Sequence, residues 1–196
     1  MLIVGTLLLA TIAFLATRAL GDLGDDPQVQ DPATAAETLP IEAASDFDPF
    51  GTPNRQESPD EVPLAHDGDL ATAWTTEPYQ RAPRFGNLKP GAGLWFDLGT
   101  TREIAEVRVT VTTPGITFQV HAVDQLRDVD AAGLDAFAAW GEPVIAPVQL
   151  QQAGSFTVPD EVPSARYWLL WITELAPRDD GRFEAGIAEV SFVGRS

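Results

Sequence analysis

The feature that most constrains the fold is a two-residue hydrophobic period that recurs along the chain from Leu39 onward. In residues 104–111 the valines at 107, 109 and 111 alternate with polar side chains, and residues 116–122 repeat the pattern. Strict alternation is typical of a strand with one buried face. Thr113-Pro114-Gly115 separates the two runs, and we expect a turn there.

Further segments extend this pattern. Residues 94–98, 156–158 and 187–193 also resemble strands, whereas Tyr167–Thr173 is apolar on both faces and is expected to be a central strand. Residues 130–140 are the one plausible short helix. Sixteen prolines and sixteen glycines agree with many turns. The chain is therefore predicted to be all-β, a sandwich or jelly roll.

The first twenty residues are of a different kind. Residues 1–17 are almost unbroken hydrocarbon, and Arg18 can extend its charge to the interface, so residues 1–20 predict a transmembrane helix. We expect an uncleaved anchor, with a cleaved signal peptide as the alternative, because no basic residue precedes the apolar run. We therefore expect a single-pass protein of the plasma membrane with an extracytoplasmic C-terminal domain. In this orientation Arg18 lies on the outer side, whereas positive charges near a membrane span are usually on the cytoplasmic side.

Residues 21–38 are acidic, contain Pro27 and Pro32, and predict a flexible linker before a domain spanning 39–196. The net charge of the whole chain is −17. Such a surface repels phosphate, so nucleic acid and anionic lipid headgroups are poor partners. Cysteine is absent, which excludes disulfides, thiolate metal sites and a lipoprotein anchor.

Residues 64–75 carry the most informative motif, in which Asp67-Gly68-Asp69 is followed by Thr72 and Trp74. This segment resembles the signature of discoidin (coagulation factor 5/8 type C), galactose-binding-like domains. Residues 93–99, 104–111 and 187–190 resemble further strands of that family, in its order. The resemblance covers about residues 40–196 and implies a discoidin-like jelly-roll β-sandwich.

The middle of the chain resembles one branch of this family. Gly133-Leu134-Asp135, residues 166–173 and Ile187-Ala188-Glu189-Val190 are similar to the domain that lies outside the membrane at the end of actinobacterial MviN-like and kinase-like proteins. This resemblance implies a role in the cell envelope, with an envelope glycan or a cell-wall precursor as the partner.

The Asp-Gly-Asp motif also predicts a structural Ca²⁺ site. Calcium takes six to eight oxygen ligands on a tight loop, and Asp67, Asp69 and Thr72 supply such oxygens. Glu189 is expected to join them from the last strand. The alternative is a turn without metal, in which Asp67 accepts hydrogen bonds from nearby backbone amides. Trp74 is expected to pack in the core beneath this turn.

A ligand site is expected in loops at one end of the sandwich. Tyr79, Arg81 and Arg84 form the one locally basic and aromatic stretch of an acidic chain, and Phe85 and Phe50 are further loop aromatics. An aromatic ring stacked on a sugar, with polar groups nearby, is the usual chemistry of such sites. The alternative is that these side chains anchor the loops.

Catalysis is not expected. The two histidines, His66 and His121, have no metal-ligand spacing, and His121 is predicted to face solvent on an alternating strand. No nucleophile or phosphate-binding motif accompanies them. We therefore predict a binding module rather than an enzyme, with a glycan-free protein-interaction or structural ectodomain of a cell-envelope complex as the alternative.

Overall fold

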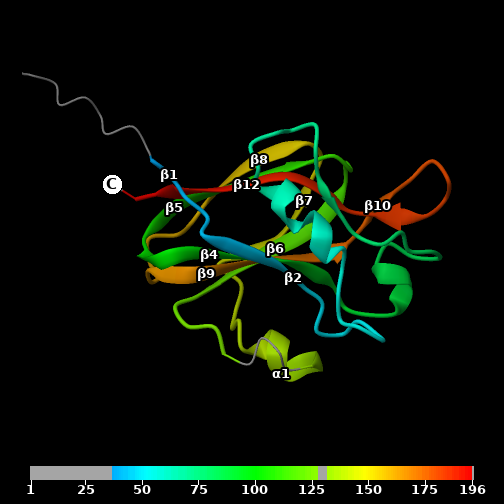
Figure 1. Cartoon of the computed structure of the whole chain (residues 1–196), viewed down its shortest axis with the longest axis horizontal. Coiled ribbons are helices and arrows are strands. Elements are labelled where there is room, and N and C mark those ends of the chain that lie inside the picture. The colour runs from blue at the N-terminus through cyan, green and yellow to red at the C-terminus, as the bar shows by residue number, and fades with distance from the viewer. Residues whose placement is uncertain (1–36, 128–131, 196) are drawn as a thin grey trace, which may run out of the picture. The chain divides into compact units, whose positions relative to one another are not determined.

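The computed structural model describes residues 37–127 and 132–195, and these form a β-sandwich of two five-stranded antiparallel sheets (Figure 1). The predicted transmembrane segment, and the linker up to residue 36, lie outside the described residues. Within the described part, no helix is both long and apolar enough to cross a membrane. The all-β prediction is confirmed for this part of the chain.

The first sheet has the order β1-β12-β5-β8, and β3 pairs with the start of β12. Its strands are β1 (Thr38–Leu39), β3 (Trp74–Thr75), β5 (Ile104–Val111), β8 (Ala153–Thr157) and β12 (Gly186–Gly194).

The second sheet has the order β2-β4-β9-β6-β7. Its strands are β2 (Ala43–Phe47), β4 (Ala92–Arg102), β6 (Ile116–Val123), β7 (Ile145–Leu150) and β9 (Ala165–Glu174). The doubly apolar segment Tyr167–Thr173 is its central strand, as predicted.

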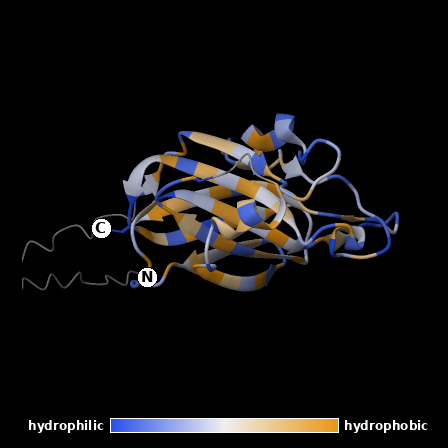
Figure 2. Cartoon of the chain, turned by 90° about the horizontal axis from the view of Figure 1, so that it is seen from below, coloured by the Kyte–Doolittle hydropathy of each residue, from blue (hydrophilic) through white to orange (hydrophobic). Residues whose placement is uncertain are grey.

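The turn at residues 113–115 connects the two layers. The strand before it, β5, belongs to the first sheet, and the strand after it, β6, belongs to the second. Alternation alone predicts that both strands have one buried face, but it does not say which sheet each strand joins. Figure 2 shows the resulting pattern, with apolar and polar residues alternating along the strands.

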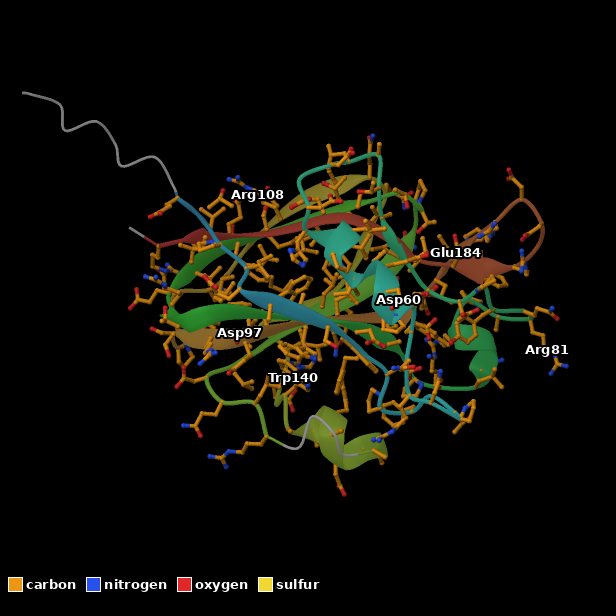
Figure 3. All side chains as sticks on the ribbon, in the orientation of Figure 1. Asp60, Arg81, Asp97, Arg108, Trp140 and Glu184 are labelled. Carbon is orange, nitrogen blue, oxygen red and sulfur yellow. The ribbon has the colours of Figure 1, made fainter. Side chains whose placement is uncertain are left out.

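The second sheet is covered on both faces. Trp168 lies in the core between the sheets, whereas Trp171, on the opposite side of β9, packs under α1 (Gly133–Ala138). Figure 3 shows Trp140 between α1 and this sheet, and its ring lies edge-on to Phe47 at 5.9 Å. Both tryptophans of β9 are therefore buried, so neither is an exposed platform.

Three short elements extend the sandwich at the end opposite to the chain terminus marked C (Figure 1). They are the 3₁₀ helix η2 (Phe85–Asn87) and the hairpin of β10 (Ala176–Pro177) and β11 (Phe183–Glu184). A second 3₁₀ helix, η1 (Pro59–Ala65), leads into the Asp-Gly-Asp turn. We call the end with η2 and the β10–β11 hairpin the loop end.

His121 is buried at 1% exposure, so the prediction that it faces solvent is wrong. Its strand alternates, but α1 and the segment after it cover the outer face of the sheet. Nδ1 lies 2.9 Å from the carbonyl oxygen of Gly141, which only accepts, so Nδ1 carries the hydrogen. Nε2 then accepts a hydrogen bond from Gln119 at 2.7 Å. Burial lowers the pKa of His121, although Gly141 and Glu142 oppose this shift.

The lowered pKa of His121 predicts acid sensitivity. The folded state holds the neutral ring, whereas the unfolded chain takes up a proton below a pH of about 6.5. The contribution of His121 to the free energy of unfolding is fully present above that pH. It is lost as the pH falls towards the lowered pKa of the folded state, by up to about 1.4 kcal/mol per pH unit. Urea unfolding of the wild type and of His121→Gln between pH 7.5 and 5 measures it. The variant should lose less stability over this range, and equal losses would contradict the assignment.

Candidate functional site

The loop end carries two adjoining hollows. The larger, about 700 Å³, is lined by Arg84, Asn87 and Glu174, among others. The smaller, about 320 Å³, lies between the loop after β2 and the loop before β4, and Tyr79 is in its wall. Leu88 and Lys89 line both hollows, so the two hollows adjoin, and we call the pair the depression. Its size suits a small ligand of one or a few rings.

A buried ion network forms the wall between these loops. Lys89 Nζ lies 2.5 Å from Asp48 Oδ2 and 2.5 Å from Glu57 Oε2. The exposed fractions of the three side chains are 5%, 2% and 1%. Burying charges is costly unless they are paired, so Lys89, the only lysine in the chain, holds the two loops together.

Aromatic rings enclose the same ammonium group. Lys89 Nζ lies 5.3 Å from the ring centroid of Tyr79 and 5.2 Å from that of Phe85. The Tyr79 hydroxyl donates to Glu57 Oε2 at 2.9 Å. Burial, followed by the charge of Glu57, raises the pKa of Tyr79, and burial also raises the pKa of Glu57 despite the neighbouring lysine.

The five predicted ligand residues have different locations. Tyr79 and Phe50 are half-buried and line the smaller hollow, and Arg84 lines the larger one, where Nε lies 3.1 Å from Glu174 Oε1. Phe85 has no exposed surface and packs edge-on under Tyr79, so it supports the site and does not present a ring to a ligand. Arg81 is exposed, lines neither hollow, and points away at the tip of its loop (Figure 3).

The backbone around the hollows is strained. Among residues 37–127 and 132–195, the non-glycine residues with positive φ all lie between positions 55 and 87. They are Arg55, Ser58, Arg81, Phe85 and Asn87. Each such conformation costs of order 1–3 kcal/mol, and such residues cluster at ligand sites. Of these five residues, Asn87 lines the larger hollow, and the other four line neither hollow.

The Asp-Gly-Asp turn forms a separate site on the first sheet. Gly68 has φ of 80°, the bend for which a glycine is needed. Its amide donates to Glu189 Oε2 at 3.0 Å, so the last strand does reach the turn. Trp74 is fully buried nearby, and its indole N–H donates to the carbonyl oxygen of Glu57 at 2.9 Å, which confirms its place in the core.

The turn also forms hydrogen bonds within itself. Asp67 accepts from the amide of Asp69 at 2.8 Å and from the hydroxyl of Thr72 at 2.8 Å, and Asp69 accepts from the amide of Ala71 at 2.9 Å. The bonds that Asp67 accepts from the amide of Asp69 and from Thr72 lower the pKa of Asp67. Burial, and to a smaller extent the charge of Asp67, raises the pKa of Glu189. Asp67 and Glu189 thus each accept a hydrogen bond from a backbone amide of the turn.

The donor set fits calcium only in part. In the described part of the chain, no group of three or more His, Asp or Glu side chains is arranged to hold a metal ion. Asp67, Asp69, Thr72 and Glu189 would supply side-chain oxygens, and backbone carbonyls would complete the shell that Ca²⁺ requires. Calcium binding at this turn stays a prediction, and a self-capped turn remains the alternative.

Sequence analysis did not identify Asp48, Glu57, Glu77 and Lys89 as site residues. The only available signal was the single lysine in a strongly acidic chain. Its partners lie 41 and 32 positions away, so no local motif connects them.

These observations define the class of fold. Two five-stranded antiparallel sheets, with a carboxylate-rich turn meeting the last strand, form a galactose-binding-like, discoidin-type sandwich. No protein-family model matches the chain.

Solved structures with this fold include three carbohydrate-binding modules, each with a TM-score of 0.50. The CBM32 module of AlyQ in complex with 4,5-unsaturated mannuronic acid is 15% identical and covers 80% of this chain and 97% of its own. CpGH89CBM32-6, produced by Clostridium perfringens, is 9% identical over 79% of this chain and 95% of its own. A pectin-binding carbohydrate-binding module is 15% identical and covers 79% of this chain and 91% of its own. At these identities the likeness establishes the fold.

The ion network predicts a large effect of Lys89→Met. The variant leaves Asp48 and Glu57 buried without a cation, and it should lower the free energy of unfolding by about 3–5 kcal/mol. Urea denaturation at pH 7 measures the loss. The matched control is the triple variant with Asp48→Asn and Glu57→Gln, which removes the unpaired charges and should recover part of the stability. A loss below about 1 kcal/mol in Lys89→Met would contradict the network.

Calcium binding at the turn predicts a shift in melting temperature. At a hundredfold excess over Kd, calcium adds about 2.7 kcal/mol to the folded state, which corresponds to roughly 5–10 °C. Thermal unfolding in millimolar CaCl₂ and in chelator measures this, with Asp67→Asn/Glu189→Gln as the variant that should not respond. Identical melting temperatures of the wild type in the two buffers would exclude the metal.

Proposed function

We propose that this chain is a non-catalytic glycan-binding module, which recognises a cell-envelope glycan or cell-wall precursor through the depression at its loop end. The observation that carries the proposal is the wall of that depression. It combines half-buried aromatic rings (Phe50, Tyr79), an exposed apolar side chain (Leu88) and polar groups held in place by ion pairs (Lys89, Arg84).

Sugars require this combination of surfaces. The C–H face of a pyranose packs on aromatic or aliphatic groups, and its hydroxyls bond to charged and amide side chains fixed around it. Leu88 is 78% exposed between the two hollows, a position suited to contact with the apolar face of a ring. The matched carbohydrate-binding modules have the same fold, which supports the proposal without identifying a ligand.

The distribution of exposed apolar residues favours a glycan over a protein partner. In the described part of the chain, the exposed large hydrophobic residues are Leu70, Leu88 and Leu134, on three separate segments. A protein-docking surface usually presents a contiguous apolar patch. The alternative of a glycan-free interaction domain therefore has less support than the glycan proposal.

We further propose that residues 1–20 anchor the chain in the plasma membrane, with the sandwich outside the cell. The first described strand, β1, pairs with the end of β12, at the terminus-bearing end of the sandwich and opposite to the loop end (Figure 1). A chain anchored ahead of β1 would be held by that end.

Substitutions in the larger hollow test the proposal. Arg84→Ala and Leu88→Ala should each lower affinity for the bound glycan by about tenfold, because each removes one contact worth about 1.4 kcal/mol. Both side chains are largely exposed, so the melting temperature should stay within about 2 °C. Binding of the detergent-solubilised full chain is measured on peptidoglycan and on an oligosaccharide array.

Arg108→Ala is the matched control, since Arg108 is exposed on β5 of the other sheet and lines neither hollow. It should bind like the wild type. If the loop-end variants also bind like the wild type while folded, the site is wrong; if no glycan binds at all, the proposed function is wrong.

A further inference from the structure

Lys89, Asp48 and Glu57 form a triad that is closed off from water. Lys89 Nζ lies 2.5 Å from Asp48 Oδ2 and 2.5 Å from Glu57 Oε2, and each of the three side chains is at most 5% exposed. The rings of Tyr79 and Phe85 lie over the same nitrogen, at 5.3 and 5.2 Å. An amine and a carboxyl group are therefore held in contact at a place where water does not stabilise their charges.

The two carboxyl groups of the triad differ in their hydrogen bonds. Glu57 has both oxygens engaged, because Oε1 accepts from the amide of Glu77 at 2.6 Å and Oε2 accepts from the hydroxyl of Tyr79 at 2.9 Å. Asp48 Oδ2 accepts from Lys89, but no donor among the described residues reaches Oδ1, which is buried. A buried acceptor without a donor is costly. Conversion of Asp48 to a neutral amide would remove a charge that its surroundings compensate only in part.

Two paired strands hold the amine and the carboxyl group in place. Asp48 directly follows β2 and Lys89 shortly precedes β4, and these strands are hydrogen-bonded neighbours in which Phe47 lies opposite Gly93. A Cβ atom on Gly51 would lie 2.2 Å from Asp48 Oδ2, so the backbone of the loop packs directly on the carboxyl group. Groups that are well oriented within one molecule can react as if their concentration were about 10⁵–10⁸ M.

We propose that Lys89 and Asp48 condense to form an intramolecular amide (isopeptide) bond, with Glu57 as the proton carrier. A proton first passes from Nζ to the Asp48 carboxylate, which leaves a neutral amine beside a carboxylic acid. The lone pair of Nζ then attacks Cγ of Asp48. Glu57 takes one proton from the nitrogen and returns it to the departing hydroxyl, so one water molecule leaves. The pair begins with one positive and one negative charge and ends with none, so no oxidant or reductant is required.

Glu57 is suited to carry this proton. Its Oε2 is in contact with Lys89 Nζ, and the amide of Glu77 and the hydroxyl of Tyr79 fix its orientation. Burial raises the pKa of Glu57 above its ordinary value, although Lys89 opposes this shift. A carboxyl group with a raised pKa accepts and returns a proton more readily near neutral pH.

The bond would provide a covalent constraint in a chain that has no cysteine. It would join positions that are 41 residues apart, at the end of β2 and ahead of β4, and it would enclose η1 and the Asp-Gly-Asp turn. A cross-link of this kind restricts the unfolded chain and thereby stabilises the folded one. The inference concerns the scaffold of the loop end, and it does not depend on which ligand binds there.

Peptide mass spectrometry of the full chain, purified in detergent and shown to be folded by circular dichroism, tests the bond. Trypsin places Asp48, Glu57 and Lys89 in three separate peptides, 19–55, 56–81 and 85–102, because it does not cleave between Lys89 and Pro90. The expected product is peptide 19–55 joined to peptide 85–102, with a mass one water molecule below their sum. Folded protein that yields only unlinked peptides, or peptide 85–102 joined to 56–81, would overturn the proposal.

Four variants assign the roles. Asp48→Ala and Lys89→Arg should contain no linked peptide, and Lys89→Arg keeps the positive charge. Glu57→Gln should contain less than about a tenth of the linked peptide, because it has lost the proton carrier. Glu77→Gln changes an exposed carboxylate in the wall of the same hollow and should be linked like the wild type. Complete linkage in Glu57→Gln would overturn the role of Glu57, and linkage in Lys89→Arg would overturn the bond itself.

Discussion

The structure depends on the burial of both faces of β9. One face carries Trp168 into the space between the two sheets, and the other carries Trp171 against Phe47, Phe137 and α1. A strand apolar on both sides is stable in water only if each side is covered, so the second sheet needs a layer above it and a layer below it. The sandwich supplies one layer. The segment containing α1 and Trp140 supplies the other, and in doing so it buries His121.

The loops at one end depend on charge rather than on apolar packing. Two carboxylates are withdrawn from water and are compensated by one lysine, and two aromatic rings surround the same ammonium group. Pairing and hydrogen bonding make this arrangement tolerable, and it orders loops that contain little secondary structure of their own. The same arrangement shapes the smaller hollow and gives its wall an excess negative charge. The residues that order the loops are therefore also residues that line the smaller hollow.

Much of the framework could be predicted from local patterns. Alternation identified β5 and β6, double-sided apolarity identified the central strand β9, and the Asp-Gly-Asp motif indicated both a tight bend and the approach of Glu189 across 121 positions. Other features had no local signal. Phe85 looks like a loop aromatic in the sequence but is fully buried, because the neighbouring Tyr79 and Lys89 close over it. The ion network joins residues more than thirty positions apart.

The sequence by itself determined that residues 104–111 and 116–122 form strands with one inner face each, since side chains alternate across a strand whatever it pairs with. It also determined the strongly negative charge, which follows from composition alone. Only the tertiary structure decided which sheet each strand joins, which outer face is covered, and which acidic side chains surround Lys89. The physical reason is that sheet pairing, burial and desolvation depend on distant segments that meet in space, and a local hydrophobic period contains no information about those meetings.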